Sequence, residues 1–135
     1  MRLSKNLERH EMACECGCGF DTVDAVLVEI LQHTVDFFEK TYNDKVVLVI
    51  TGGNRCHWHN DSLREKGIHT SPRSQHLYGR AADFKIFVGN KEQVQPREVM
   101  AYLNDQWDDV VSIGLYSNRL HLDTRTDGGK RWRSL

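Results

Sequence analysis

A short apolar run, KVVLVITGG at residues 45–53, constrains the fold of this chain more than any other stretch. It is rich in β-branched residues and ends in two glycines, a pattern that predicts a strand buried within a sheet. A buried strand must be covered by other elements, so the neighbouring segments should supply further strands and helices.

The neighbouring segments show helical or strand periodicity. Apolar residues recur at helical spacing in residues 21–42 and 95–107, and Pro96 favours a helix start in the second segment. A shorter helix is expected at residues 59–67, with Gly67 as its end. Further strands are expected at residues 81–89, 110–117 and 119–125. This order predicts an α+β domain in which helices pack on a largely antiparallel sheet.

Length and charge limit the classes of function. A chain of 135 residues can form one domain with a hydrophobic core, so we expect a single domain over residues 1–135. The 18 basic and 19 acidic residues are scattered and leave a net charge of −1, which argues against a nucleic-acid partner. No apolar run has the length of a membrane span, and the N-terminus lacks the apolar centre of a secretory signal. We therefore expect a monomer that is made in the cytoplasm and does not insert into a membrane.

Two stretches carry side-chain types that bind metals. In RLHLDTR, a strand would place His121 and Asp123 on one face and two leucines on the other. In SQHLYGRAAD, His76 and Asp83 lie on either side of a segment that contains several small residues. Taken alone, the first pair could lie on a solvent-exposed face, and the second could flank a tight loop. Together, a His, an Asp and a second His are typical of a catalytic zinc site, whose three protein ligands leave a position for water.

SQHLYGRAAD followed by GLYSNRLHLDTR resembles the zinc D-alanyl-D-alanine peptidases, which share a fold with hedgehog signalling domains. The shared pattern is Ser-x-His-x-x-Gly-x-Ala-x-Asp, and then His-x-Asp on a late strand. ACECGCG, VVLVITGGNRCHWHN and the tail GGKRWRSL also resemble the small phage and bacterial branch of this family, so the resemblance covers nearly the whole chain. It implies one Zn²⁺ per chain, with His76, Asp83 and His121 as ligands. Gly79 and residues 81–82 match the positions where the family's chain turns between two ligands and enters a strand.

The resemblance also implies residues that bind substrate. Arg55 follows the glycines at the end of the first strand, where the family has an arginine that holds a substrate carboxylate or carbonyl. A guanidinium group suits this task because it donates two parallel hydrogen bonds, although an arginine here could also be a surface residue. Ser74 and Gln75 are expected to support the site or to bind substrate. Relatives commonly have Ser-Gly-Tyr before this arginine, whereas residues 52–54 are Gly-Gly-Asn, which would widen or reshape the cleft.

The motifs leave the general base open. Related enzymes often place an acid three residues before the last ligand, or a second His two residues before it, but Asn118 and Arg119 occupy these positions. Asp123 shares a strand face with His121 and is the candidate catalytic base. Alternatively, Asp123 orients a ligand without touching the metal. His59 is expected to be structural or to line the cleft.

Four cysteines, Cys14, Cys16, Cys18 and Cys56, permit three arrangements. Cysteines at two-residue intervals suggest thiolate ligation of a metal, although zinc-finger spacings are wider and no second pair follows. Disulfides are not expected in the cytosol, although one between the N-terminal segment and Cys56 could form after release. Packing of reduced thiols, with the N-terminal segment next to Cys56, is the preferred interpretation.

Two classes of function are compatible with these features. The resemblance implies a zinc peptidase that hydrolyses amide bonds involving D-amino acids in peptidoglycan stem peptides, either as a carboxypeptidase that trims terminal D-Ala or as a cell-wall endopeptidase. The alternative is a binding module that keeps the fold and the metal but has lost hydrolysis, as hedgehog domains illustrate. One domain without a secretory signal or a wall-binding module favours a phage or prophage endolysin, released to the cell wall through a membrane lesion.

Overall fold

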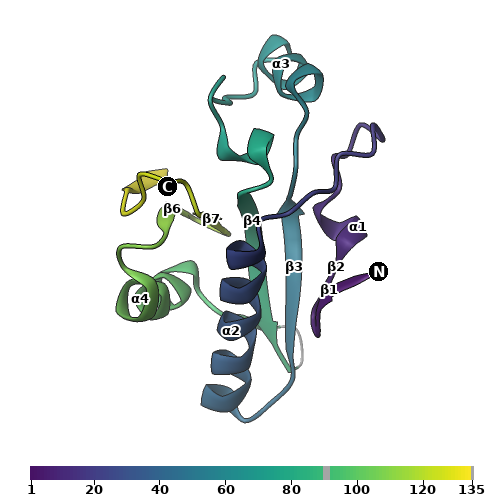
Figure 1. Ribbon diagram of the computed structural model, residues 1–135. Helices are drawn as coiled ribbons and strands as arrows, with labels where there is room; N and C mark the ends of the chain where they lie inside the picture. Colours follow the sequence, from purple (N-terminus) through teal and green to yellow (C-terminus); the bar gives the residue numbers. More distant parts are fainter. Residues whose placement is uncertain (90–91, 135) are drawn as a thin grey trace.

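A sheet with the strand order β3-β4-β7-β6-β8 forms the centre of the fold (Figure 1). The computed structural model describes residues 1–89 and 92–134. Neighbouring strands along this order are antiparallel up to β6, whereas β6 and β8 are parallel, and the short β5 pairs with β4. The strands are β3 (Val46–Gly52), β4 (Ala81–Val88), β5 (Glu92–Gln93), β6 (Ser112–Tyr116), β7 (Leu120–Asp123) and β8 (Arg131–Ser134). The prediction of helices on a largely antiparallel sheet is therefore confirmed.

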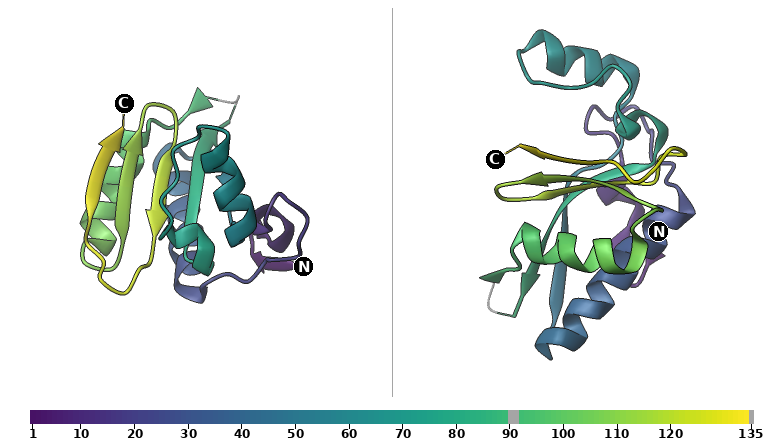
Figure 2. Two further views of the ribbon diagram at one scale, coloured as in Figure 1. Left: turned by 90° about the horizontal axis from the view of Figure 1, so that it is seen from above. Right: turned by 90° about the vertical axis from the view of Figure 1, so that its left-hand side faces the viewer.

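Two long helices supply most of the helical side of the core. α2 (Ala25–Tyr42) buries a stripe of apolar residues at helical spacing, and α4 (Pro96–Trp107) begins with a proline in its first turn. The buried residues of both helices belong to one core cluster with the inner face of the sheet. α3 (His57–Glu65) lies on the opposite side of the strands from α4, as the right-hand view of Figure 2 shows.

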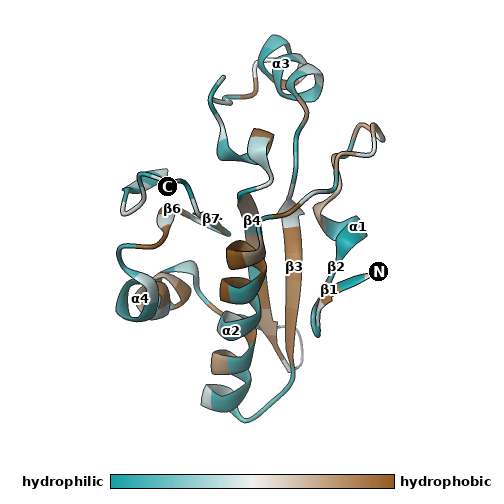
Figure 3. Cartoon of the chain, in the orientation of Figure 1, coloured by the Kyte–Doolittle hydropathy of each residue, from teal (hydrophilic) through white to brown (hydrophobic). Residues whose placement is uncertain are grey.

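The strands alternate between the core and the outer face as their period of two requires. On β4, Phe84 and Ile86 are buried in the core, whereas Asp83 lies on the opposite face. On β7, Leu120 and Leu122 enter the same core, which leaves His121 on the outer face. β3 and β4 are both drawn mainly in the hydrophobic colour in Figure 3. The prediction of a strand buried within the sheet is wrong for β3, however, because β3 is an edge strand that pairs with β4 alone among the described strands and exposes Val47 and Val49 on one face. Metal-binding side chains and core side chains thus come from the same two strands.

The sequence pattern missed the N-terminal arm, which consists of β1 (Arg2–Ser4), β2 (Leu7–Glu8) and α1 (Arg9–Met12). Elements this short contain too few residues to show a period. Met12 is fully buried, and its carbonyl oxygen accepts a hydrogen bond from the backbone N–H of Asn54 at 2.8 Å. The arm therefore supports the segment that follows β3.

Two further differences from the predicted elements concern helix ends. α3 begins at His57, two residues before the expected start, because the Cys56 sulfur caps it by accepting the His59 N–H. A 3₁₀ helix, η1 (Gln75–Tyr78), follows the predicted loop. Among the described helices, none has the length and hydrophobicity needed to cross a membrane.

Candidate metal centre

The pairing of three strands places Asp83 and His121 side by side. Asp83 on β4 is the register partner of His121 on β7 and of Gly52 on β3, so the three residues form one row across the sheet. Gly52 leaves room in this row, because a Cβ built there would lie 2.9 Å from Asp83 Oδ2. In the sequence, the glycine at the end of the first strand is the feature that indicates this need for space beside Asp83.

His76 reaches the same point from η1. Ser74 caps this helix, since its Oγ accepts the backbone N–H of His76 at 3.2 Å. Gly79 ends the helix in the left-handed conformation with a φ of 69°, and a Cβ there would collide with the carbonyl oxygen of Thr22. The turn between His76 and Asp83 therefore requires a glycine, as the sequence predicted.

The three predicted ligands converge on one point. His76 Nε2 lies 3.3 Å from Asp83 Oδ2, and His121 Nδ1 lies 2.9 Å from Asp83 Oδ1. Ligand atoms about 2.0–2.1 Å from a tetrahedral zinc ion are about 3.3 Å apart. One ligand atom from each residue lies within 4.8 Å of the other two, so His76, Asp83 and His121 form a candidate metal site.

Hydrogen bonds on the far side of each ring select the nitrogen that faces this site. His76 Nδ1–H donates to the carbonyl oxygen of Gly53 at 2.6 Å, which leaves the Nε2 lone pair free for a metal. His121 lies between two carboxylates, with Nε2 at 2.8 Å from Asp123 Oδ2 and Nδ1 at 2.9 Å from Asp83 Oδ1. If Nδ1 bound a metal, Nε2–H would donate to Asp123. Both rings thus have a hydrogen-bond acceptor on the side that points away from the site.

Charges in the site reinforce this arrangement when no metal is bound. Burial raises the pKa of Asp83, but hydrogen bonds from His121 and His76 outweigh it and hold that pKa well below its usual range. Burial likewise opposes protonation of His121, but hydrogen bonds to Asp123 and Asp83 leave its pKa raised. Asp83 is thus held as a carboxylate, the form in which it binds a metal.

Asp123 lies behind His121 rather than in front of the site. Its side chain is completely buried, and Arg125 donates to both of its oxygens, from Nε at 2.8 Å and from Nη2 at 2.6 Å. Burial opposes ionisation of Asp123, but hydrogen bonds from Arg125 and His121 lower its pKa to about 2. The carboxylate is thus fixed between a guanidinium group and the ring nitrogen of His121 that faces away from Asp83.

An open cleft of about 660 Å³ lies over the His–Asp–His set. Arg55, Ser74 and Gln75, the three predicted substrate-binding residues, all line it. Arg55 Nη2 donates to Ser74 Oγ at 3.2 Å, and Gln75 Oε1 is buried without a hydrogen-bond partner in the described structure. Burial lowers the pKa of the Arg55 guanidinium, and the charge of Asp83 opposes this effect.

Cations dominate the lining of this cleft. They are Arg55, Arg73, Lys85, Arg119 and Arg125. Asp83 is the one carboxylate among the described lining residues. A chain with a net charge of −1 thus concentrates positive charge around a single site.

One wall of the cleft was not predicted from the sequence. Trp132 on β8 packs against His121 with 5.1 Å between ring centroids, and the ring occupies the space above Gly114 on β6. Asn118 and Arg119 line the cleft, with the Arg119 guanidinium 4.1 Å from the centre of the Tyr116 ring. His69, which sequence reasoning did not select, also lines the cleft, whereas His59 is not among the lining residues.

Two histidines and an aspartate that meet in an open cleft of an α+β fold are typical of a zinc hydrolase. The sequence matches the family Peptidase M15 over residues 5–123, and the chain belongs to this family of zinc-dependent peptidases. The match spans both stretches that contain the candidate ligands. Comparisons with curated proteins and with solved structures gave no significant match.

Proposed function

We propose that this zinc peptidase hydrolyses amide bonds involving D-amino acids in the peptide stems of peptidoglycan. The observation that carries the proposal is the cationic cleft around the candidate metal site. Stem peptides carry free carboxylates close to their amide bonds, and a cleft that concentrates positive charge attracts and orients such substrates. The resemblance to D-alanyl-D-alanine peptidases supports the same substrate class.

Metal binding and substrate binding each have candidate residues in the cleft. His76, Asp83 and His121 would hold zinc, which polarises a carbonyl group and makes water nucleophilic at neutral pH. Arg55, held by Ser74, would bind a substrate carboxylate or carbonyl through its planar guanidinium group. Gln75 lines the same cleft and would support the site or bind substrate.

Asp123 would act as a positioning residue rather than as the catalytic base. Its carboxylate accepts from His121 Nε2, whereas the ring nitrogen that faces Asp83 is Nδ1. A buried carboxylate that is also bound by Arg125 can fix the ring and strengthen it as a ligand. His69 is the remaining imidazole in the described cleft lining and is the next residue to test for proton transfer.

The site of action follows from the substrate. We propose that the protein reaches the cell wall from the cytoplasm after phage-type or prophage-type release and works there as a monomeric endolysin. An open cleft would admit a cross-linked peptide as well as a free chain end, so endopeptidase and carboxypeptidase activity are both compatible with it.

Digestion of purified peptidoglycan by the zinc-loaded protein tests the proposal. Mass spectrometry of the products should show new termini at D-amino acid bonds. Free D-Ala would identify a carboxypeptidase, and cleaved cross-links would identify an endopeptidase. His76→Ala should abolish the products, whereas His33→Ala, at an exposed histidine on α2, should not. If the zinc-loaded protein binds the wall material but releases no product, the binding-module alternative replaces the peptidase.

A further inference from the structure

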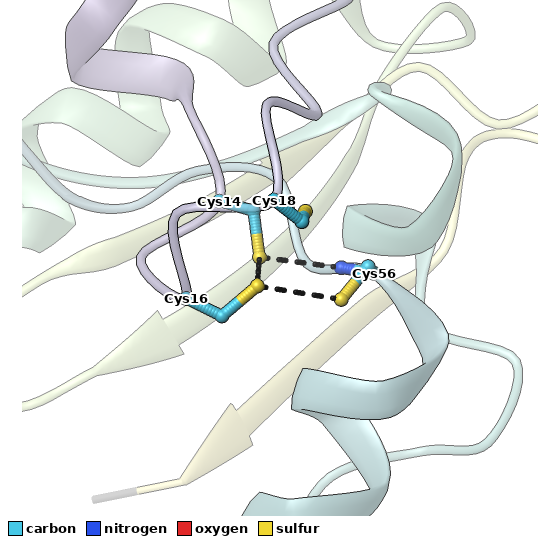
Figure 4. A group of neighbouring side chains, drawn as sticks. All are labelled: Cys14, Cys16, Cys18 and Cys56. Atoms are coloured by element: carbon cyan, nitrogen blue, oxygen red, sulfur yellow. Dashed lines mark hydrogen bonds between the residues drawn. The ribbon is translucent and has the colours of Figure 1, made fainter.

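Four cysteines converge beside the N-terminus of α3, outside the His–Asp–His site (Figure 4). Cys14, Cys16 and Cys18 come from the segment after α1, and Cys56 directly precedes α3. Their four sulfur atoms all lie within 4.8 Å of one another. All four are free thiols, so the expectation of reduced cysteines near one another describes this structure.

The backbone conformation of the loop after α1 brings the sulfur atoms of its three cysteines close together. An extended chain would separate Cys14 from Cys18 by about 13 Å. Gly17 and Gly19 instead adopt positive φ values of 81° and 90°, which other residues rarely adopt. The backbone N–H of Cys14 donates to the carbonyl oxygen of Phe20 at 2.9 Å and closes the loop. Both glycines have open space around them, so backbone conformation rather than crowding explains their presence.

Two of the sulfur separations are close to those of a tetrahedral metal site. Cys14 Sγ and Cys16 Sγ are 3.4 Å apart, and Cys16 Sγ and Cys56 Sγ are 3.6 Å apart. Sulfur ligands about 2.3 Å from a tetrahedral zinc ion are about 3.8 Å apart. Thiols are weak hydrogen-bond donors, so contacts between them contribute little to holding four cysteines together without a metal.

Backbone N–H groups also point at these sulfur atoms. The N–H of Cys56 donates to Cys14 Sγ at 3.5 Å, and the N–H of His59 donates to Cys56 Sγ at 3.4 Å. Such donors stabilise thiolates, the form in which cysteine binds a metal. The second donor also explains why α3 begins where it does.

We propose that Cys14, Cys16, Cys18 and Cys56 bind a second zinc ion in a closed, structural site. Four thiolate ligands leave no position for water, in contrast to the three-ligand site in the cleft. The ion would join the loop after α1 to the residue that follows Arg55. The same two segments already meet where Asn54 N–H donates to the Met12 carbonyl oxygen. Since the Gly53 carbonyl oxygen accepts from His76, the second zinc would also stabilise the backbone that orients a candidate catalytic ligand.

Metal analysis of purified, zinc-loaded variants tests this proposal independently of peptidase activity. The unaltered chain should hold about two zinc ions, and the double variant Cys16→Ser/Cys18→Ser should hold about one. His76→Ala should lose the other ion and keep the cysteine-bound one. Cobalt in place of zinc should give a thiolate-to-cobalt charge-transfer band in His76→Ala and none in the double cysteine variant. Cys18 is exposed and Cys16 half-buried, so the double variant should fold, which circular dichroism verifies.

Three results would overturn the proposal. One is a zinc content that stays the same in the folded double cysteine variant. Another is a metal-free protein whose intact mass shows that the cysteines have formed disulfides under reducing purification. The third is a cobalt charge-transfer band that persists without Cys16 and Cys18. Peptidase activity on peptidoglycan can fail in all variants without affecting any of these readouts.

Discussion

Replacement of Asp123 by Asn tests how the candidate site holds His121. Asparagine keeps the shape of the side chain but removes the charge and one of the two acceptor oxygens. In the structure, Asp123 Oδ2 accepts from His121 Nε2 at 2.8 Å and from Arg125 Nη2 at 2.6 Å. The variant therefore loses at least one charge-assisted hydrogen bond.

The expected effect is a weaker zinc site rather than a lost proton carrier. Partners of metal ligands typically contribute 10- to 100-fold in metal affinity, or about 1.4–2.7 kcal/mol. This range agrees with the roughly 1.5–3 kcal/mol of one hydrogen bond to a charged group. We expect Asp123→Asn to raise the Kd for zinc about 10- to 100-fold and to regain most of its activity when zinc is saturating.

Competition with a chromophoric chelator gives the Kd, and peptide hydrolysis at limiting and saturating zinc gives the rescue. Asp127→Asn is the matched control, because Asp127 is exposed and pairs with Lys130 away from the site. A variant that binds zinc normally but loses about 100- to 10,000-fold in kcat/KM at every zinc concentration would refute the positioning role. Asp123 would then be the catalytic base.

Three other perturbations test the rest of the site. Gly52→Ala should displace Asp83 and lower the zinc content, because the new Cβ would lie 2.9 Å from the Asp83 carboxylate. Val49→Ala on the same strand should leave the zinc content unchanged. Arg55→Lys should keep zinc but lower kcat/KM on peptidoglycan fragments, with a loss of about 1–3 kcal/mol in transition-state binding. Arg64→Lys, at an exposed arginine, should leave kcat/KM unchanged. In the metal-free protein, the raised pKa of His121 stabilises the fold below about pH 6.5, and this stabilisation is lost as the pH rises. The lowered pKa of Asp83 stabilises the fold above about pH 4, and this stabilisation is lost as the pH falls. Thermal melts should therefore show a Tm that is highest between about pH 4 and pH 6.5 and falls on either side. A Tm that rises steadily with pH would contradict that pairing.

Local patterns in the sequence determined the main elements and the donor types of the site. The apolar runs of β3 and β4 and the helical stripe of α2 are properties of consecutive residues, so their periods show in the sequence. The same period of two predicted that His121 and Asp123 share one face of a strand. The motif that joins His76 to Asp83 contains the glycine that the turn between them requires.

Only the tertiary structure decided which of these groups meet and from which side. Strand pairing between residues far apart in the chain brings Asp83 next to His121 and places Gly52 in the same row. The sequence left Asp123 open as a base or as an orienting group, because sharing a strand face does not fix which ring nitrogen a carboxylate reaches. Long-range packing likewise placed Trp132 against His121 and brought Cys56 to the N-terminal cysteines. These contacts depend on register and on side-chain direction, which are set by the whole sheet rather than by any one segment.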